Sequence, residues 1–386
     1  MRILIVSNNL HIGGVQKALV SLLWNIHKEH DVTLLLFHPD GKLLKELPPD
    51  TKLISPRSGF RFLGTTKHDV KGLEYLQRSF YAAITRLFGR KAALRLMSAG
   101  QDTLGEYDVA VSYLHNGADN AFYGGCTEFV LSHVKVKRKI AFLHCDWGRS
   151  GANTAYNAEL YSRFDGIAAC SRGCAEAFVS LNPELGDRVH VVYNCHRYED
   201  IRSRAAEAEV ELPSDRLNIV TVARLGPEKG VTRALEAIAA LGAARRRIHY
   251  YIIGDGVEKS QVLELMRRYS LESTVTLLGE MENPYGYIGA ADLLLIPSRS
   301  EAAPLVIGEA TALGTPVLST KTSSAEEMIL TPGLGWVCEN SAESIRSELE
   351  LLIISPELLT KKRQTLAKMT FDNASAAEQF DRLIRN

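Results

Sequence analysis

The sequence predicts an α/β protein built from two Rossmann-like, doubly wound domains. Short apolar runs rich in β-branched residues alternate with helical segments along the chain, which is typical of parallel sheets covered by helices. A charged, alanine-rich stretch at residues 199–216 separates a first series of such runs from a second. With 386 residues, 46% of them hydrophobic, the chain can hold two domains of ordinary size.

The first series starts at the N-terminus, where residues 2–7 form an apolar strand and Gly13-Gly14 opens a helix. Further strands are expected at residues 31–37, 108–113, 138–144, 166–171 and 190–193. We therefore predict a first domain over residues 1–197, followed by a linker over residues 198–216.

The second series predicts a domain over residues 217–370. Its strands are expected at residues 218–223, 249–253, 274–278, 291–297 and 316–319. Because ligands of doubly wound sheets bind at the carboxyl ends of strands, we expect a cleft between the two domains. The last helix, over residues 371–386, carries Ala376, Phe380 and Leu383 at the spacing of one buried stripe.

The bulk composition argues against several classes of protein. Lys plus Arg and Asp plus Glu both number 45, and this balance argues against a general nucleic-acid binder. No apolar stretch approaches the roughly 20 residues that span a bilayer, and Met1-Arg2 leads directly into a strand without a signal peptide. The six cysteines form neither close metal-binding pairs nor a dense disulfide pattern. We expect a cytoplasmic protein with reduced thiols.

Residues 57–98 depart from the overall balance of charge. Nine cations stand against only Asp69 and Glu74, and apolar residues are interleaved with the cations. The cations are Arg57, Arg61, Lys67, Lys71, Arg78, Arg86, Arg90, Lys91 and Arg95. A basic amphipathic helix of this kind can lie on an anionic membrane surface. It can also pack on its own domain with a solvated basic face. The second interpretation is favoured, since such helices are common on soluble proteins.

Two carboxylates flank the start of a predicted helix in the second domain. Glu301 lies in the loop after the apolar strand 291–297, and Glu309 lies further along the helix. A helix start offers free N–H groups and a positive dipole end, which suit phosphate. Carboxylates accept hydrogen bonds from hydroxyls, so the two could hold different sugars of one ligand. A sugar nucleotide, with its sugar, diphosphate and ribose, has that shape.

Arg224 and Lys229 follow another strand of the second domain and open a helix. Two fixed cations at such a place would neutralise a diphosphate leaving group. A solvated loop is the alternative, but the matching position of the Glu301 loop favours a ligand site. Gly13-Gly14 permits close approach of a phosphate or sugar, or forms a simple turn.

His144 ends a strand of the first domain and is followed by Cys145 and Asp146. An imidazole there could donate to a sugar hydroxyl or assist proton movement. The trio could also indicate a nucleophilic cysteine or a metal site, although no second ligand cluster at zinc spacing supports a metal. On residue type alone, a structural histidine is favoured.

Together these motifs resemble the retaining glycosyltransferases of the two-Rossmann-domain GT-B type, specifically glycosyltransferase family 4. The most specific element is Glu301, seven intervening residues and Glu309, followed by Ala-Leu-Gly-Thr-Pro-Val at residues 312–317. The other matching elements, in chain order, are Gly13-Gly14, His144, Ser171-Arg172, Val192-Tyr193-Asn194, Arg224, Lys229-Gly230 and Gly254-Asp255-Gly256.

The resemblance implies a role for each of these residues. Arg224 and Lys229 would hold the donor diphosphate, Glu301 would contact the transferred sugar, and Glu309 would bind the ribose. His144 would also contact the donor sugar. Other donor contacts are implied at Gly13, Gly14, Gly279, Ala303, Pro304 and Leu305. The first domain would bind the acceptor, and the last helix would return to pack on it.

The resemblance also implies the reaction. We expect a retaining transfer from a nucleotide-diphosphate sugar, a UDP-linked hexose or N-acetylhexosamine, to a glycan or lipid-linked acceptor in bacterial surface polysaccharide synthesis. No metal or other cofactor is expected, and the sequence contains no Asp-x-Asp motif. A cytoplasmic enzyme, peripheral at the inner face of the membrane through residues 57–98, would fit. Alternatives are a sugar-nucleotide epimerase on the same fold and a non-catalytic nucleotide-sugar-binding module.

Overall fold

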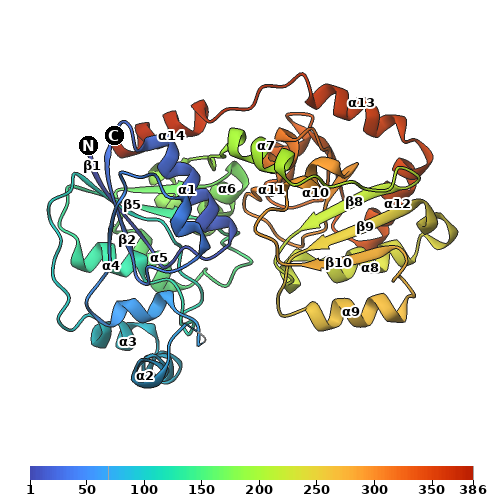
Figure 1. Ribbon diagram of the computed structural model, residues 1–386. Helices are drawn as coiled ribbons and strands as arrows, with labels where there is room; N and C mark the ends of the chain where they lie inside the picture. Colours follow the sequence, from blue (N-terminus) through green and yellow to red (C-terminus); the bar gives the residue numbers. More distant parts are fainter. Residues whose placement is uncertain (68, 386) are drawn as a thin grey trace. The chain divides into compact units, whose positions relative to one another are not determined.

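The computed structural model of the protein describes residues 1–67 and 69–385. The chain divides into two compact units. The N-terminal unit comprises Met1–Cys195 and Asn373–Asn386, and the C-terminal unit comprises His196–Asp372. Each unit is a parallel sheet covered by helices, so the predicted α/β class with two Rossmann-like domains is confirmed (Figure 1).

The described residues of the N-terminal unit form a seven-stranded sheet of order β3-β2-β1-β4-β5-β6-β7, with every pair parallel. Its strands are β1 (Arg2–Ser7), β2 (Asp31–Leu36), β3 (Lys52–Ile54), β4 (Val109–Ser112), β5 (Arg138–Leu143), β6 (Gly166–Ala169) and β7 (Val189–Val191). Strand β3 was not predicted, because its three residues lie at the sheet edge and are mostly exposed.

The helices of this unit include a C-terminal helix that returns from the end of the chain. They are α1 (Gly14–Ile26), α2 (Gly72–Phe88), α3 (Arg90–Met97), α4 (Cys126–His133), α5 (Ala155–Tyr161), α6 (Arg172–Leu181) and α14 (Ala374–Arg385). Figure 1 shows α14 beside α1. The predicted stripe of Ala376, Phe380 and Leu383 is buried in the same core as the β1 side chains. The Arg138 Nε atom also donates to the Leu383 carbonyl, at 2.9 Å.

The described residues of the C-terminal unit form a six-stranded parallel sheet of order β10-β9-β8-β11-β12-β13. Its strands are β8 (Leu217–Val222), β9 (Ile248–Ile253), β10 (Val275–Gly279), β11 (Leu293–Ile296), β12 (Val317–Thr320) and β13 (Gly335–Cys338). Its helices are α7 (Tyr198–Glu207), α8 (Val231–Ala239), α9 (Lys259–Arg268), α10 (Tyr285–Ala290), α11 (Val306–Ala312), α12 (Ala342–Ile354) and α13 (Glu357–Leu366). Apolar clusters pack on the two faces of the sheet.

Residues 198–216 differ from the expected linker. Helix α7 occupies more than half of this stretch and packs on α10 and α11. Its Ile201 is buried with Tyr285 and Ile288 in the core of the C-terminal unit. Alanine and charged residues have high helix propensity, so one apolar anchor is enough to dock a helix that composition alone suggested was a connector.

No helix among the described residues combines the length and the apolar character that crossing a bilayer requires.

Candidate functional site

Two loops of the C-terminal unit are held together at the carboxyl edge of its sheet. They follow the neighbouring strands β8 and β11. The amide of Arg299 donates to the Glu228 carbonyl at 2.8 Å, and the Arg233 guanidinium donates to the Pro297 carbonyl at 2.6 Å. Gly230 has a φ of +62°, and a Cβ there would lie 2.1 Å from the Pro297 oxygen. A glycine is therefore needed for the two loops to meet.

This contact predicts the effect of Gly230→Ala. The added methyl group must displace the Pro297 segment, and the alanine must hold a left-handed backbone conformation. We therefore expect a loss of more than about 2 kcal/mol in unfolding free energy. Gly242→Ala is the matched control, since Gly242 has a φ of +57° with no atom within 4 Å of the added Cβ. It should lose only the conformational part, about 1 kcal/mol. Urea unfolding of both variants checks the difference, and equal losses would contradict it.

The loops bring Lys229 and Glu301 together. The Lys229 Nζ atom lies 2.8 Å and 3.0 Å from the two carboxylate oxygens of Glu301. The Ser298 hydroxyl donates to Glu301 Oε1 at 2.6 Å. The side chains are 24% and 10% exposed, so this ion pair is partly removed from water while still open to a ligand. Two predicted site residues, 72 positions apart in sequence, thus form one charged centre.

Arg224 lies in the same loop as Lys229 but points elsewhere. Its side chain is 70% exposed, and its Nη2 atom lies 2.5 Å from Glu228 Oε1. An exposed pair of this kind contributes little to stability, so a ligand can recruit the guanidinium at small cost. Among the described residues, no hydrogen bond or ion pair joins Arg224 to Glu301.

Glu309 lies in the first turn of α11 and is buried. Its Oε1 accepts a hydrogen bond from the Tyr285 hydroxyl at 3.3 Å. The loop before α11 places the remaining predicted residues Ala303, Pro304 and Leu305 at the surface, each half-buried. Helix α11 begins directly after these residues, at Val306.

Gly279 ends β10 with a φ of +76°. Its carbonyl accepts a hydrogen bond of 2.8 Å from the amide of Gly254, which follows β9. The edge of the sheet is thus lined by backbone rather than by bulky side chains at this place.

Gly13 and Gly14 lie at the start of α1 in the N-terminal unit, just after β1. A Cβ added at Gly14 would meet no atom within 4 Å. Packing therefore does not require glycine at Gly14, where the space is open, whereas a Cβ added at Gly13 would lie 2.5 Å from the Gln16 Oε1 atom.

His144 follows β5 and packs against aromatic rings, with its ring stacked on Phe142 and close to Tyr113. Burial, with a smaller contribution from nearby His115, lowers the pKa of His144 to about 3. A hydrogen bond ties the imidazole to the Tyr113 backbone, while the Nε2 atom is buried without a partner among the described residues. The neutral ring therefore offers a bare nitrogen as acceptor, rather than the donor that the sequence suggested.

The structure adds a residue that the sequence analysis missed. His115 follows β4, the neighbour of β5, and burial lowers its pKa to about 4. Its Nδ1 atom is also buried without a partner among the described residues. The position of His115 three residues beyond an apolar strand was the available signal, because neighbouring parallel strands end at one edge of a sheet.

Residues 203–369 match the family model described as glycosyl transferases group 1. These residues form a glycosyl transferases group 1 domain. The chain is 31% identical over 156 residues to the putative colanic acid biosynthesis glycosyltransferase WcaL of Salmonella typhimurium, covering 38% of each. It is 28% identical over 228 residues, 58% of each, to the Campylobacter jejuni N-acetylgalactosamine-N,N'-diacetylbacillosaminyl-diphospho-undecaprenol 4-alpha-N-acetylgalactosaminyltransferase. The alignments thus span less than two thirds of these relatives.

Solved structures show the fold over the whole chain. Anabaena Alr3699/HepE in complex with UDP-glucose matches with a TM-score of 0.69 and 17% identity, covering 99% of this chain and 98% of that one. WaaG, a glycosyltransferase involved in lipopolysaccharide biosynthesis, matches with a TM-score of 0.61 and 16% identity over 100% of both chains. The fold is that of the GT-B glycosyltransferases.

The glycosyl transferases group 1 domain contains the predicted residues of the C-terminal unit. These are Arg224, Lys229, Gly279, Glu301, Ala303, Pro304, Leu305 and Glu309. Gly13, Gly14 and His144 lie outside the matched residues, in the N-terminal unit.

The cysteine beside His144 is not suited to nucleophilic chemistry. Cys145 is buried, and this burial raises the pKa of its thiol to about 12. The thiolate is the nucleophilic form, so Cys145 is a poor nucleophile at neutral pH. All six cysteines are described, and all are buried and free.

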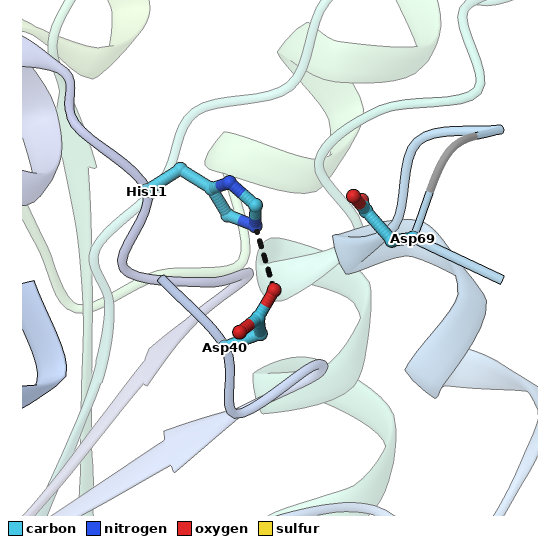
Figure 2. Close-up of side chains that lie close together, drawn as sticks. All are labelled: His11, Asp40 and Asp69. Atoms are coloured by element: carbon cyan, nitrogen blue, oxygen red, sulfur yellow. Dashed lines mark ion pairs between the residues drawn. The ribbon is translucent and has the colours of Figure 1, made fainter. Parts of the chain in front are cut away.

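A separate group of side chains in the N-terminal unit could hold a metal ion (Figure 2). It combines His11, which follows β1, with Asp40 and Asp69, and one ligand atom from each lies within 4.8 Å of the others. The His11 Nε2 atom lies 3.5 Å from Asp40 Oδ2. Asp69 accepts a hydrogen bond from the Thr66 amide at 2.5 Å. An imidazole with two carboxylates suits a divalent transition metal, whereas the His144 trio forms no such group among the described residues.

The lowered pKa of His144 predicts acid sensitivity. The unfolded chain binds a proton at this residue below about pH 6.5, but the folded protein does not until about pH 3. Folding stability should therefore fall as the pH drops from 6.5 towards 3, by at most about 1.4 kcal/mol per pH unit for this histidine. Above pH 6.5 the residue should have no effect. Urea unfolding at several pH values gives the unfolding free energy as a function of pH. This free energy should depend less steeply on pH in His144→Asn than in the unaltered protein. An unchanged pH dependence would contradict the lowered pKa of His144.

Proposed function

We propose that the protein is a retaining glycosyltransferase. It would move a sugar from a nucleotide-diphosphate donor, a UDP-linked hexose or N-acetylhexosamine, to a glycan or lipid-linked acceptor in bacterial surface polysaccharide synthesis. The observation that carries the proposal is the Lys229–Glu301 ion pair. It lies partly exposed at the carboxyl edge of the sheet in a glycosyl transferases group 1 domain. The similarity to glycosyltransferases that are named for polysaccharide synthesis supports the substrate class.

The charged pair provides groups for both halves of a donor. The Lys229 ammonium can donate to a diphosphate oxygen, and the exposed Arg224 can swing in as a second cation. Together they would stabilise the negative charge that develops on the leaving diphosphate. The Glu301 carboxylate would accept hydrogen bonds from hydroxyls of the transferred sugar. The acceptor hydroxyl would attack from the face that the diphosphate leaves and would give its proton to the leaving phosphate oxygen. This front-face attack retains the anomeric configuration.

The remaining predicted residues would contact other parts of the donor. In the C-terminal unit, Gly279 would border the base, Glu309 would bind the ribose, and the 303–305 loop would border the phosphates. In the N-terminal unit, the open space above Gly14 and the acceptor nitrogen of His144 suit a phosphate or sugar oxygen and a sugar hydroxyl. These assignments are part of the proposal.

We also propose that transfer needs no metal, because Arg224 and Lys229 supply the positive charge. Activity in excess EDTA should equal activity in Mg²⁺ or Mn²⁺. The group of His11, Asp40 and Asp69 allows a second test, because it could bind a divalent ion in the N-terminal unit. If a divalent ion raises activity and His11→Ala removes that gain, the metal-independent proposal fails and a metal acts through the N-terminal unit.

The free, buried cysteines fit a reducing compartment, so we place the reaction in the cytoplasm.

A donor screen tests the proposal. The protein would be mixed with a panel of UDP-, GDP- and dTDP-sugars, and the donor that raises its melting temperature would be assayed with glycan and lipid-linked acceptors. Release of nucleoside diphosphate together with an α-linked product from an α-linked donor would support a retaining transferase. An altered nucleotide sugar formed without acceptor would indicate an epimerase. Tight donor binding without turnover on any acceptor would indicate a binding module.

A further inference from the structure

Helix α2 exposes an apolar stripe. Leu73, Leu76, Phe80 and Leu87 are each between 55% and 75% exposed, and their spacing places them on one face of the helix. Figure 1 shows α2 on the outside of the N-terminal unit, next to α3. Thr85, on the opposite side of the helix, is its buried residue. Helix α2 therefore does not pack this stripe on its own domain, whereas α3 buries Leu94 and Met97 as the favoured interpretation expected. A contiguous exposed apolar face usually marks an interaction site.

A hollow of about 530 Å³ lies at the foot of this stripe. Leu76 and Phe80 line it on the side of α2, and Arg57 and Arg61 line it together with the 3-10 turn Gly59–Gly64. The Arg61 guanidinium lies over the Phe62 ring and 3.4 Å from Glu74. Arg57 is exposed and makes no hydrogen bond or ion pair with the residues that the structure describes. Two guanidinium groups and two large apolar side chains thus line the same hollow.

The cations of residues 57–98 are solvent-facing with two exceptions. Arg90 is buried against Glu128, and Arg78 donates two hydrogen bonds to the Thr65 carbonyl. The other seven cations of residues 57–98 are exposed or half-exposed: Arg57, Arg61, Lys67, Lys71, Arg86, Lys91 and Arg95. Asp69 and Glu74 are their acidic neighbours in the same segment. Residues 57–98 therefore combine the exposed stripe of α2 with an excess of exposed cations, and Arg57 and Arg61 lie directly beside the stripe at the hollow.

We propose that this face docks on a bilayer surface that contains anionic phospholipids. The stripe of α2 would enter the boundary between headgroups and acyl chains, and Arg57 and Arg61 would take lipid phosphates at the hollow. Contact with a second copy is less suitable, because a two-fold contact would set this cationic face against itself. The proposal does not depend on transferase activity, so it can fail or hold separately from the proposed function.

Vesicle flotation of the full chain tests the proposal. The probes are vesicles of phosphatidylcholine alone and of phosphatidylcholine mixed with phosphatidylglycerol. We expect binding to the mixed vesicles that weakens as salt is added. Arg57→Gln/Arg61→Gln should weaken it about 30-fold, about fivefold for each charge removed from the surface. Leu76→Gln/Phe80→Gln should weaken it by at least about tenfold.

Matched variants keep the test specific. Arg246→Gln/Arg247→Gln removes the same charge from exposed positions of the C-terminal unit, and Leu351→Gln/Ile354→Gln removes exposed apolar side chains from α12. Both should bind mixed vesicles as the unaltered protein does. Equal recovery of the unaltered protein with both kinds of vesicle would overturn the proposal. So would equal weakening by the control variants. A dimer that Leu76→Gln/Phe80→Gln dissociates, without vesicle binding, would assign the face to a second copy and would also overturn it.

Discussion

Replacing Arg90 by methionine should destabilise the N-terminal unit by about 3–5 kcal/mol, because it leaves a buried carboxylate without its partner. The side chains of Arg90 and Glu128 are 3% and 6% exposed, and Arg90 Nε lies 2.6 Å from Glu128 Oε1. Burial alone would raise the pKa of Glu128, but the attraction of Arg90 and hydrogen bonds from Arg90, Thr127 and Asn116 together outweigh it, so the pKa is lowered. The carboxylate therefore stays charged and depends on the guanidinium.

The guanidinium also organises the neighbouring loop. Its Nη1 atom donates to the carbonyls of Ala121 and Tyr123, at 3.2 and 2.5 Å, and its Nη2 atom donates to Asn116 Oδ1 at 2.9 Å. Asn116 is buried and Ala121 is half-buried, so both lose a partner in the variant where water replaces it poorly. The large expected loss follows from the whole network rather than from a single ion pair.

Urea unfolding measures this loss, and an exposed pair provides the control. Arg346 and Glu350 on α12 lie 2.9 Å apart with both side chains 37% exposed. Arg346→Met should lose less than about 1 kcal/mol. The double variant Arg90→Met/Glu128→Gln should lose less than the sum of its single variants, since the second change removes the stranded charge. Strict additivity, or equal losses for Arg90→Met and Arg346→Met, would show that the buried pair is not coupled.

Arg90 also shows where the sequence was uninformative. Its charge placed it in the basic segment, because composition carries no record of burial, and only its distant partner Glu128 reveals it as structural. The same limit applies to α7, whose alanine and charged residues suggested a connector. In both cases the deciding contact comes from a residue far away in the chain.

The sheets were more predictable. Apolar β-branched runs identified eleven of the thirteen strands in the described part of the chain to within about two residues, because buried parallel strands are almost continuously apolar. The two missed strands, β3 and β13, are edge strands of three and four residues. Such short runs do not stand out from loops.

The candidate site was predictable in its parts and not in their pairing. Strand ends located the Lys229 and Glu301 loops, since ligands bind at the carboxyl edge of such sheets. The sequence did not indicate that β8 and β11 are neighbours, and this pairing brings the two side chains into contact. His115 was missed for the same reason, because only the pairing of β4 with β5 sets it beside His144.

The pairing of Lys229 with Glu301 predicts opposite effects of replacing each residue. Lys229→Ala removes a charge-assisted donor and should weaken binding of the donor's nucleoside diphosphate by about 1.5–3 kcal/mol. Glu301→Gln removes the carboxylate whose two oxygens accept hydrogen bonds from Lys229 and thereby compete with the diphosphate for the ammonium group. It also removes a negative charge near the proposed diphosphate position. This variant should bind the nucleoside diphosphate at least as tightly as the unaltered protein.

Transfer should nevertheless fall in Glu301→Gln, because the amide is a weaker acceptor for the sugar hydroxyls than the carboxylate. Calorimetry with the nucleoside diphosphate and steady-state transfer with the complete donor separate the two effects. Lys321→Ala is the control, since Lys321 forms an exposed 3.4 Å pair with Glu339 just after β12, at the same edge of the sheet. It should change neither quantity. If Glu301→Gln and Lys229→Ala lose nucleoside diphosphate affinity equally, Glu301 supports the loop rather than the sugar. If neither variant changes binding or transfer, the donor site lies elsewhere.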